Sequence, residues 1–392
     1  MTSNPAINST SMNVAQRTLG FTESVIRGMT RLANEHDAIN LAQGFPNFPA
    51  PDVVKEAAVE AIRADINQYA VTWGSARLRR ILAERYRDWY GMEVDPERDL
   101  TVTCGATEAM IAALMAIVDP GDEVILFEPF YENYGPDTIL CGAEPVFVRL
   151  DPGAPLDIDA VKHAVTAKTR AIVINTPNNP TGKVFDRADL EVLAAICRER
   201  DIYAVTDEIY EHILYEGEHV PIASLEGMFD RTITVSGASK TFSITGWRIG
   251  TIVAPATITG AIRKVHDFLT VGAPAPLQEG VAAALEQLGP DYYKTLADQY
   301  RERRDILVQG LQRVGFGCES PAGAYYIMAD FTQLSEKDDV EFSEWLTSEI
   351  GVAPVPGSSF YSSGRGTGLV RFAFCKTTHL LVEAVERLER MG

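Results

Sequence analysis

The chain has 392 residues and a formal net charge of −19, and 46% of its residues are hydrophobic. This length exceeds what one hydrophobic core usually serves and predicts two or three domains. The acidic balance argues against a nucleic-acid or anionic-membrane surface, because both need clustered lysine and arginine.

The first residues, 1–19, are polar and lack the basic and apolar segments of a signal peptide, so we expect a flexible N-terminal arm. The apolar run at 110–118 is too short to span a membrane. The five cysteines are scattered, without a CxxC or a Cys/His cluster, which indicates neither a disulfide framework nor a zinc site. We therefore expect reduced thiols, a cytoplasmic location, no metal ion and no membrane association.

Residues 20–48 are expected to pack on a small domain or in the cleft beside it. From about residue 100, short apolar runs alternate with helical stretches, and several of the runs are typical of strands buried on both faces. The predicted strands are 100–105, 123–129, 144–150, 171–177, 202–208, 232–237 and 248–254. This alternation predicts an α/β fold, in which a mainly parallel seven-stranded sheet is sandwiched by helices in a large domain, residues 49–280.

The pattern changes after about residue 280. A long helical stretch at 286–314 is followed by short strands within 324–331 and 369–374, and by helices at 339–351 and 378–391. These elements predict a second, smaller α+β domain, residues 281–392.

Polar residues follow several predicted strands, where ligands of parallel sheets bind. Gly105, Ala106 and Thr107 follow a strand and begin a helix, so their free N–H groups and the helix dipole favour an anion. An ordinary turn with Thr107 as N-cap explains the same residues. Asn179 lies in the turn 175–182 and either points its amide into the cleft or serves only a rigid turn.

The stretch 206–210 ends the strand 202–208 and brings Asp207 and Tyr210 to its edge. A buried carboxylate needs a partner to stay ionised, which a pyridinium nitrogen would provide, although such an aspartate can also cap a helix. Lys240 follows another strand and could form a Schiff base, or be a solvated loop lysine. Arg248 could bind a phosphate through its planar guanidinium, or pair with a carboxylate. The order and spacing of Asn179, Asp207, Tyr210, Lys240 and Arg248 match those of residues that bind pyridoxal 5′-phosphate (PLP).

The sequence resembles the class I/II aminotransferases of PLP fold type I along nearly its whole length. The stretches NTPNNPTGKVF (175–185), TDEIY (206–210), SKTFSITGWRIG (239–250) and VRFAF (370–374) stand in the family's order and spacing. The stretches at 41–57, 67–74 and 127–134 are most similar to the branch with kynurenine/glutamine transaminases and a methionine aminotransferase.

The resemblance implies a role for each matching residue around the cofactor ring. Lys240 would hold PLP as a Schiff base and move the proton between Cα and C4′. Asp207 would keep the pyridine nitrogen protonated, so that the ring accepts electrons. Asn179 and Tyr210 would bond the ring oxygen O3′, and Tyr131 would stack on the ring.

It also implies the phosphate and substrate contacts. The Gly105–Thr107 turn, through the backbone of Ala106 and Thr107, would bind the phosphate together with Arg248. Tyr69 would reach the phosphate of the neighbouring subunit, which implies a homodimer with shared sites. Arg371 would bind the substrate α-carboxylate, and Gly44 would offer backbone to the same group.

Two departures from the family pattern bear on the site. Many relatives carry a phosphate-binding serine at the position of Gly237, and Ser236 and Ser239 are both candidates to replace it. The segment 266–278 has no arginine where aspartate-specific relatives place one, which favours a neutral donor: aromatic, sulfur-containing or glutamine-like. Trp73 and Phe21 are candidates to line its pocket, or to serve core or interface packing.

The expected function is therefore a PLP-dependent aminotransferase that moves an amino group from a neutral L-amino acid to a 2-oxo acid by a ping-pong mechanism. The same residues also suit a C–S β-lyase, a cyclase, an oxidase or an aspartate-type aminotransferase. A non-catalytic ligand-binding module on this fold is a further alternative. A nicotinamide enzyme is not expected, because no GxGxxG follows an early strand.

Overall fold

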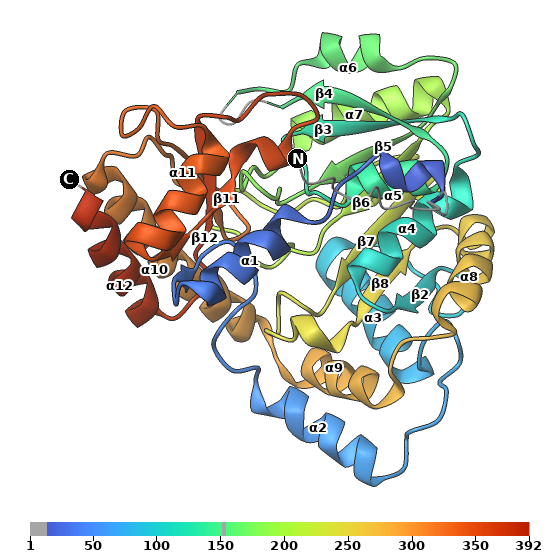
Figure 1. The fold of residues 1–392 in the computed structure, drawn as a ribbon. Helices are drawn as coiled ribbons and strands as arrows, with labels where there is room; N and C mark the ends of the chain where they lie inside the picture. The colour runs from blue at the N-terminus through green and yellow to red at the C-terminus, as the bar shows by residue number, and fades with distance from the viewer. Residues whose placement is uncertain (1–13, 151–153, 392) are drawn as a thin grey trace, which may run out of the picture.

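A seven-stranded sheet forms the centre of the structure, a computed structural model that describes residues 14–150 and 154–391 (Figure 1). Its strands lie in the order β2-β8-β7-β6-β5-β3-β4. Only β8 runs antiparallel to its neighbours, so the predicted mainly parallel sheet is confirmed. The bounds are β2 Leu100–Thr103, β3 Glu123–Glu128, β4 Glu144–Arg149, β5 Thr169–Asn175, β6 Tyr203–Asp207, β7 Thr232–Gly237 and β8 Gly250–Val253.

The continuous apolar runs arise because both faces of this sheet are covered. In β3, Val124 and Leu126 enter one hydrophobic core, and Ile125 and Phe127 enter the core on the opposite face. Successive side chains of a strand point to opposite faces, so a strand between two helical layers needs an apolar residue at every position.

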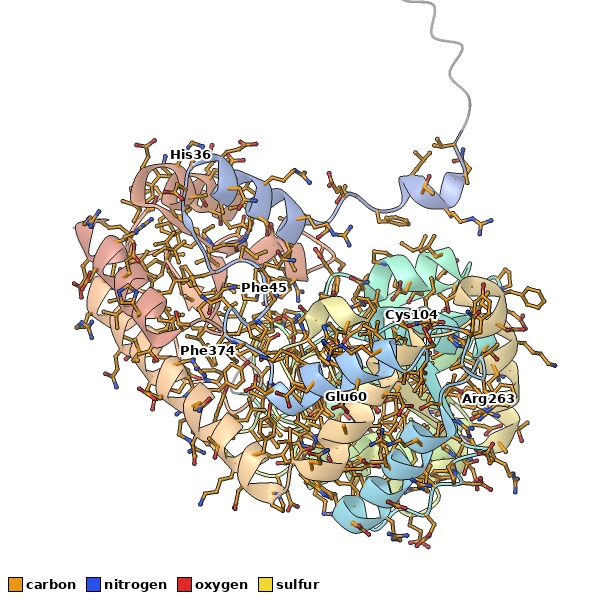
Figure 2. The ribbon with its side chains drawn as sticks, turned by 90° about the horizontal axis from the view of Figure 1, so that it is seen from below. His36, Phe45, Glu60, Cys104, Arg263 and Phe374 are labelled. Atoms are coloured by element: carbon orange, nitrogen blue, oxygen red, sulfur yellow. The ribbon has the colours of Figure 1, made fainter. Side chains whose placement is uncertain are left out.

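Helices cover the two faces of the sheet. Residues of α4 (Ala106–Ile117), α5 (Tyr134–Leu140) and α8 (Ala256–Thr270) share the core of one face. Residues of α6 (Ile158–Ala164) and α7 (Arg187–Arg200) share the core of the other. Beside the β2 edge, α9 (Ala275–Gln287) packs on both α2 (Asp52–Arg63), which carries Glu60 in Figure 2, and α3 (Ala76–Tyr90).

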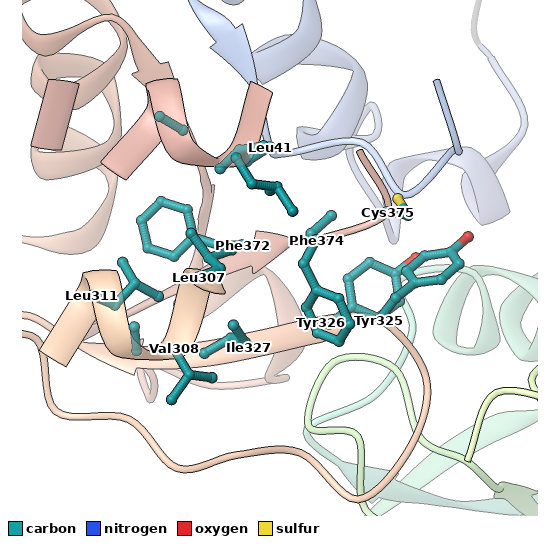
Figure 3. Packing of buried hydrophobic residues seen from close by; sticks show 14 of the residues in the cluster. Leu41, Leu307, Val308, Leu311, Tyr325, Tyr326, Ile327, Phe372, Phe374 and Cys375 are labelled. Atoms are coloured by element: carbon teal, nitrogen blue, oxygen red, sulfur yellow. The ribbon is translucent and has the colours of Figure 1, made fainter. Parts of the chain in front are cut away.

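The C-terminal part builds a second core around a three-stranded antiparallel sheet in the order β11-β12-β9. Figure 3 shows residues of its long helix packed beside those of the strands, among them Leu311 and Phe372. The elements are α10 Pro290–Val314, β9 Tyr326–Asp330, α11 Asp339–Trp345, β11 Val355–Pro356, β12 Leu369–Ala373 and α12 Thr378–Leu388. The helix predicted at 339–351 is α11 followed by one π-helical turn, Leu346–Ile350.

The N-terminal segment packs on this smaller part. Helix α1 (Val25–Glu35) contacts its strands, and β1 (Ile39–Asn40) pairs in parallel with β10 (Val352–Ala353). Most of the predicted arm, residues 1–13, lies outside the described residues, and Gln16–Leu19 form a 3-10 turn.

The expected division after residue 280 falls inside α9. Because α9 packs on α2 and α3 of the large part, we propose instead that the division lies at Leu288–Gly289, the turn between α9 and α10.

The described part of the chain contains no helix long and apolar enough to cross a membrane. Within the same residues, no three His, Cys, Asp or Glu side chains are grouped so that they could hold a metal ion.

The contact between α10 and α12 yields a prediction on stability. A methyl group at Gly310 of α10 would lie 2.2 Å from Cγ2 of Val385 on α12. Gly310→Ala is therefore expected to lower the free energy of unfolding by about 1–3 kcal/mol through overpacking. Thermal unfolding, followed by circular dichroism, measures the effect.

Gly260 of α8 is the matched control, because an added methyl there meets no atom within 4 Å. Gly260→Ala is expected to raise the free energy of unfolding by about 0.5–1 kcal/mol, since alanine loses less backbone entropy in a helix. Melting temperatures that shift in the same direction in both variants would contradict this account.

Candidate active site

A cleft of about 460 Å³ lies at the carboxyl edge of the large sheet. Asn175 and Asp207 are register partners at the ends of β5 and β6. Strand β8 runs in the opposite direction, so its beginning lies at this same edge and brings Arg248 to the cleft. The predicted site residues that line the cleft are Gly44, Ala106, Thr107, Tyr131, Asn179, Asp207, Tyr210, Lys240, Arg248 and Arg371.

Asp207 ends β6 and is only 8% exposed. Its Oδ2 accepts a hydrogen bond from the Tyr134 hydroxyl at 2.7 Å, and its Oδ1 accepts one from the N–H of Ile209 at 3.2 Å. Burial raises the pKa of Asp207, and the two donors and the charge of Lys240 oppose that rise. A protonated ring nitrogen beside this carboxylate would stabilise its ionised form further.

Three tyrosines of the site escaped the sequence reasoning. Tyr134 lies three residues after Tyr131 in the stretch 127–134, and the position of its hydroxyl follows from how α5 packs. The Tyr210 and Tyr326 hydroxyls are 2.9 Å apart, and the Tyr325 hydroxyl donates to the carbonyl of Gly44 at 2.8 Å. Burial raises the pKa of Tyr210, so its phenol is neutral at physiological pH.

Lys240 lies three residues after β7 and donates from Nζ to the carbonyl oxygen of Gly44 at 3.0 Å. Burial lowers the pKa of this amine to about 8, and the charges of Arg248 and Arg371 act in the same direction. About a tenth of the amine is therefore uncharged, and thus nucleophilic, at pH 7, far more than for an ordinary lysine.

Arg248 and the start of α4 form an anion-binding corner. Its Nη2 donates to Oγ1 of Thr107 at 3.2 Å, beside the N-terminal turn of the helix. Gly105 has φ +83°, and a Cβ on it would lie 2.4 Å from Nη2 of Arg248. Gly105 does not itself line the cleft; glycine there lets the guanidinium approach the backbone. Free N–H groups, the helix dipole and a guanidinium together suit a phosphate.

Arg371 is fully buried on β12. Its Nη1 donates to Oδ1 of Asn179 at 2.8 Å, and its Nη2 donates to the carbonyl of Ala42 at 2.7 Å. The guanidinium also lies over the rings of Tyr326 and Phe360. Among the described residues, Nε of Arg371 has no hydrogen-bond partner. The group is thus fixed in place with a donor that a carboxylate could use.

The two candidate serines lie on different sides of the loop. Ser239 lines the cleft, whereas Ser236 donates to Oε1 of Glu211 at 2.8 Å, in a second polar layer behind the site. In that layer, the Tyr90 hydroxyl donates to Glu211 at 2.6 Å, and His219 lies 2.8 Å from Glu208. Glu208 and Glu211 alternate with Asp207 and Tyr210 along the chain, so their hydrogen bonds hold the segment 207–211 in place.

Three other candidates do not reach the cleft of this chain. Tyr69 is 84% exposed and does not line it. Trp73 lies under the Arg263 guanidinium, 4.7 Å from ring centroid to Cζ, and Phe21 is half-buried; neither lines the cleft. Phe45 of the N-terminal segment, labelled in Figure 2, is a wall residue that the sequence reasoning did not name.

The residues of the cleft fit PLP. They include a buried carboxylate that could pair with a ring nitrogen, an amine that could combine with an aldehyde, a corner suited to a phosphate and a guanidinium suited to a carboxylate. Together with the sheet topology, these features define the PLP-dependent enzymes of fold type I.

Comparison with known proteins identifies the family. Residues 36–388 match the family model of aminotransferase class I and II, and the chain belongs to this PLP-dependent family. A probable N-succinyldiaminopimelate aminotransferase of Mycobacterium tuberculosis is 40% identical, with 94% of this chain and 96% of the relative covered. The solved structure of the M. tuberculosis enzyme has a TM-score of 0.94, at 39% identity, covering 97% of this chain and 100% of that one.

Two further relatives differ in the substrates that their names state. Escherichia coli methionine aminotransferase is 37% identical over the full length of both chains. Its solved structure has a TM-score of 0.93, with 97% of this chain and 100% of that one covered. Human kynurenine–oxoglutarate transaminase 1 is 38% identical, with 92% of this chain and 94% of the relative covered. The chain is therefore an aminotransferase, and these names alone do not specify its substrate.

The lowered pKa of Lys240 predicts how cofactor loading depends on pH. Only the uncharged amine attacks an aldehyde, so the rate at which cofactor-free protein combines with PLP should rise about tenfold per pH unit below the pKa. The rise should level off near pH 8, the value to which burial lowers the Lys240 pKa. Stopped-flow absorbance measures this rate.

Lys240→Ala serves as the control and should bind PLP without this pH-dependent step. A midpoint near 10.5, the ordinary value for lysine, would contradict the burial of the amine.

Proposed function

We propose that the protein transfers the amino group of a neutral L-amino acid to a 2-oxo acid. The donor would be aromatic, sulfur-containing or glutamine-like. The observation that carries the proposal is that one cleft holds the buried amine of Lys240, the carboxylate of Asp207 and the fixed guanidinium of Arg371. We propose the same roles for these residues as the family resemblance implies.

When bound, PLP supplies an aldehyde that combines with amines and a ring that accepts electrons. Asp207 would hold the proton on the ring nitrogen, aided by the donors from Tyr134 and Ile209. Lys240 would take the proton from the substrate Cα and return it to C4′, since its amine is partly uncharged near neutral pH. Asn179 and Tyr210 would orient the ring through O3′.

Arg371 would bind the substrate α-carboxylate through N–H donors that its single bonds to Asn179 and Ala42 leave free. Its fixed orientation lowers the entropy that substrate binding must offset. At the other end of the cleft, the N–H groups of Ala106 and Thr107 would bind the phosphate together with Arg248. Ser239 is the serine placed to assist them.

The neutral-donor proposal draws support from the apolar wall of the cleft, where Ile26, Phe45 and Tyr131 lie. An acidic donor is the second candidate, and Arg27 favours it. Arg27 is exposed, lines the same cleft, and its side chain forms no hydrogen bond or ion pair with the described residues. Glu132, bonded to Ser24 at the same rim, opposes an acidic donor.

We propose further that the protein is a homodimer of a reducing compartment such as the cytoplasm. The five cysteines are all free, which supports a reducing compartment. The exposure of Tyr69 supports the homodimer, because its proposed phosphate contact requires the neighbouring subunit.

The donor class is tested by adding single amino acids to the PLP-loaded protein without any oxo acid. Methionine, glutamine or an aromatic amino acid should change the cofactor absorbance and release one oxo acid per site, faster than aspartate or glutamate does. Lys240→Ala should slow this half-reaction by at least about 10²–10⁴-fold, the usual contribution of a proton-transfer group.

Arg27→Gln separates the two donor classes. A preference for aspartate or glutamate that disappears in this variant would establish the acidic alternative. Continued release of ammonia and oxo acid, without lasting conversion of the cofactor, would instead indicate a lyase, cyclase or oxidase.

The shared site predicts complementation between two variants. Tyr69→Phe should weaken PLP binding about 10–100-fold, because a hydrogen bond to a charged group is lost. A heterodimer of Tyr69→Phe with Lys240→Ala contains one unaltered site and one doubly altered site. Equilibrium titration should therefore detect one tight PLP site per heterodimer, and none in the Tyr69→Phe homodimer. Dimers that show no tight site on mixing would refute the contact across subunits.

A further inference from the structure

Asp137 is a buried carboxyl group in the cleft to which the family resemblance gives no role. It lies on α5, is 6% exposed and lines the same cleft as Lys240 and Asp207. Its Oδ2 has no hydrogen-bond partner among residues 14–150 and 154–391. No lysine, arginine or histidine of those residues forms an ion pair with it. A carboxyl group in such a place needs either a proton or a ligand.

The groups near Asp137 are neutral phenols and a thiol. Tyr131, Tyr134 and Cys141 all have pKa values that burial raises and that the charge of Asp137 raises further. Asp207 also raises the pKa of Tyr131 and Tyr134, so both carboxyl groups lie near these two rings.

The charged groups on the elements packed against α5 have other surroundings. Glu108 of α4 forms a hydrogen bond with His266, and Glu128 of β3 accepts one from the N–H of Ser362. Glu123 of β3 accepts one from the Thr166 hydroxyl. Arg17 of the 3-10 turn Gln16–Leu19, and Glu144 and Arg149 of β4, are exposed.

The carboxyl groups of Asp137 and Asp207, which both line the cleft, differ in what stabilises their charged forms. Asp207 receives two hydrogen bonds and the attraction of Lys240, whereas Asp137 receives none of these. The ionised form is therefore better stabilised in Asp207 than in Asp137, and Asp137 holds a proton more readily. Burial raises the pKa of Asp137 to about 7. Two carboxyl groups of one cleft whose surroundings favour different protonation states frequently have distinct functional roles.

We propose that Asp137 is a second acid of the cofactor site, which binds PLP in its protonated form by donating a hydrogen bond into the cleft on the side of Tyr134 and Asp207. This inference rests on the proposed place of PLP in the cleft. The neutral acid leaves Asp207 as the one anion for the ring nitrogen. Its ionisation would add a second negative charge and remove a donor, and PLP would then bind more weakly.

The test compares PLP binding to cofactor-free protein from pH 6 to 9 in the unaltered chain, Asp137→Asn and Asp137→Leu. Asparagine keeps the size and a neutral donor; leucine keeps the size alone. The Kd of the unaltered chain relative to that of Asp137→Asn should rise above pH 7, by up to about tenfold per pH unit. The Kd of Asp137→Leu should be about 3–10-fold higher than that of Asp137→Asn at every pH, because leucine cannot donate the hydrogen bond.

These ratios cancel the titration of Lys240 and of the cofactor phosphate, which all three proteins share. A ratio between the unaltered chain and Asp137→Asn that does not change with pH would overturn the proposal. Equal Kd values for Asp137→Leu and Asp137→Asn would show that Asp137 donates no hydrogen bond to PLP and would overturn the proposal.

Thermal unfolding of the same cofactor-free proteins provides a readout independent of PLP. A carboxyl group whose folded pKa is raised stabilises the fold when protonated, and this contribution is lost as the pH rises from its unfolded value, 3.8, to its folded value, about 7. The Tm of the unaltered chain should therefore fall relative to that of Asp137→Asn between pH 5 and 8. Glu144→Gln, at an exposed carboxyl group, should show no such trend.

The two readouts separate the possible failures. A pH-dependent Tm difference with a constant Kd ratio would show a buried proton without a role in cofactor binding, which overturns the inference. Failure of the unaltered chain to bind PLP at all would overturn the proposed place of PLP, and the inference with it.

Discussion

The hydrogen bonds of the buried Arg371 guanidinium join the three parts of the chain on which the site depends. Arg371 lies on β12 of the three-stranded sheet, Asn179 follows β5 of the large sheet, and Ala42 belongs to the N-terminal segment. A buried cation with unpaired nitrogens would be costly, so each partner that holds it also fixes the geometry between the parts. The cleft between these parts, which contains Lys240 and Asp207, thereby keeps its shape.

Local charge in the cleft opposes the charge of the whole chain. The protein carries a net charge of −19, yet Lys240, Arg248 and Arg371 meet in one small volume. The carboxyl groups of Glu132, Asp137 and Asp207 line the same cleft and offset part of this charge. The guanidinium groups at its two ends still suit a cofactor phosphate and a substrate carboxylate. The same crowding helps to keep the Lys240 amine partly uncharged, which its chemistry requires.

The fold was largely predictable because its causes are local. Strands covered on both faces need continuous apolar runs, and all seven predicted strands are present. The polar residues after those strands, such as Asp207 and Lys240, were predicted to meet because parallel strands end at a common edge. The family resemblance supported the same grouping, and the structure brings most of these residues into one cleft.

Other features depended on how elements pack against each other. Nothing in the order of residues distinguishes Ser239, which faces the cleft, from Ser236, which faces Glu211, because the loop after β7 decides their directions. Tyr134 and Asp137 likewise enter the site only through the rotation of α5 against the sheet.

The sequence by itself thus determined the layers, the order of the strands along the chain and the chemical types at their ends, since periodicity and turn residues act over a few positions. Only the tertiary structure decided which side chains share the cleft and how they are paired. The reason is that hydrogen bonding and burial depend on neighbours far apart in the chain, as the bond between Arg371 and Asn179 illustrates.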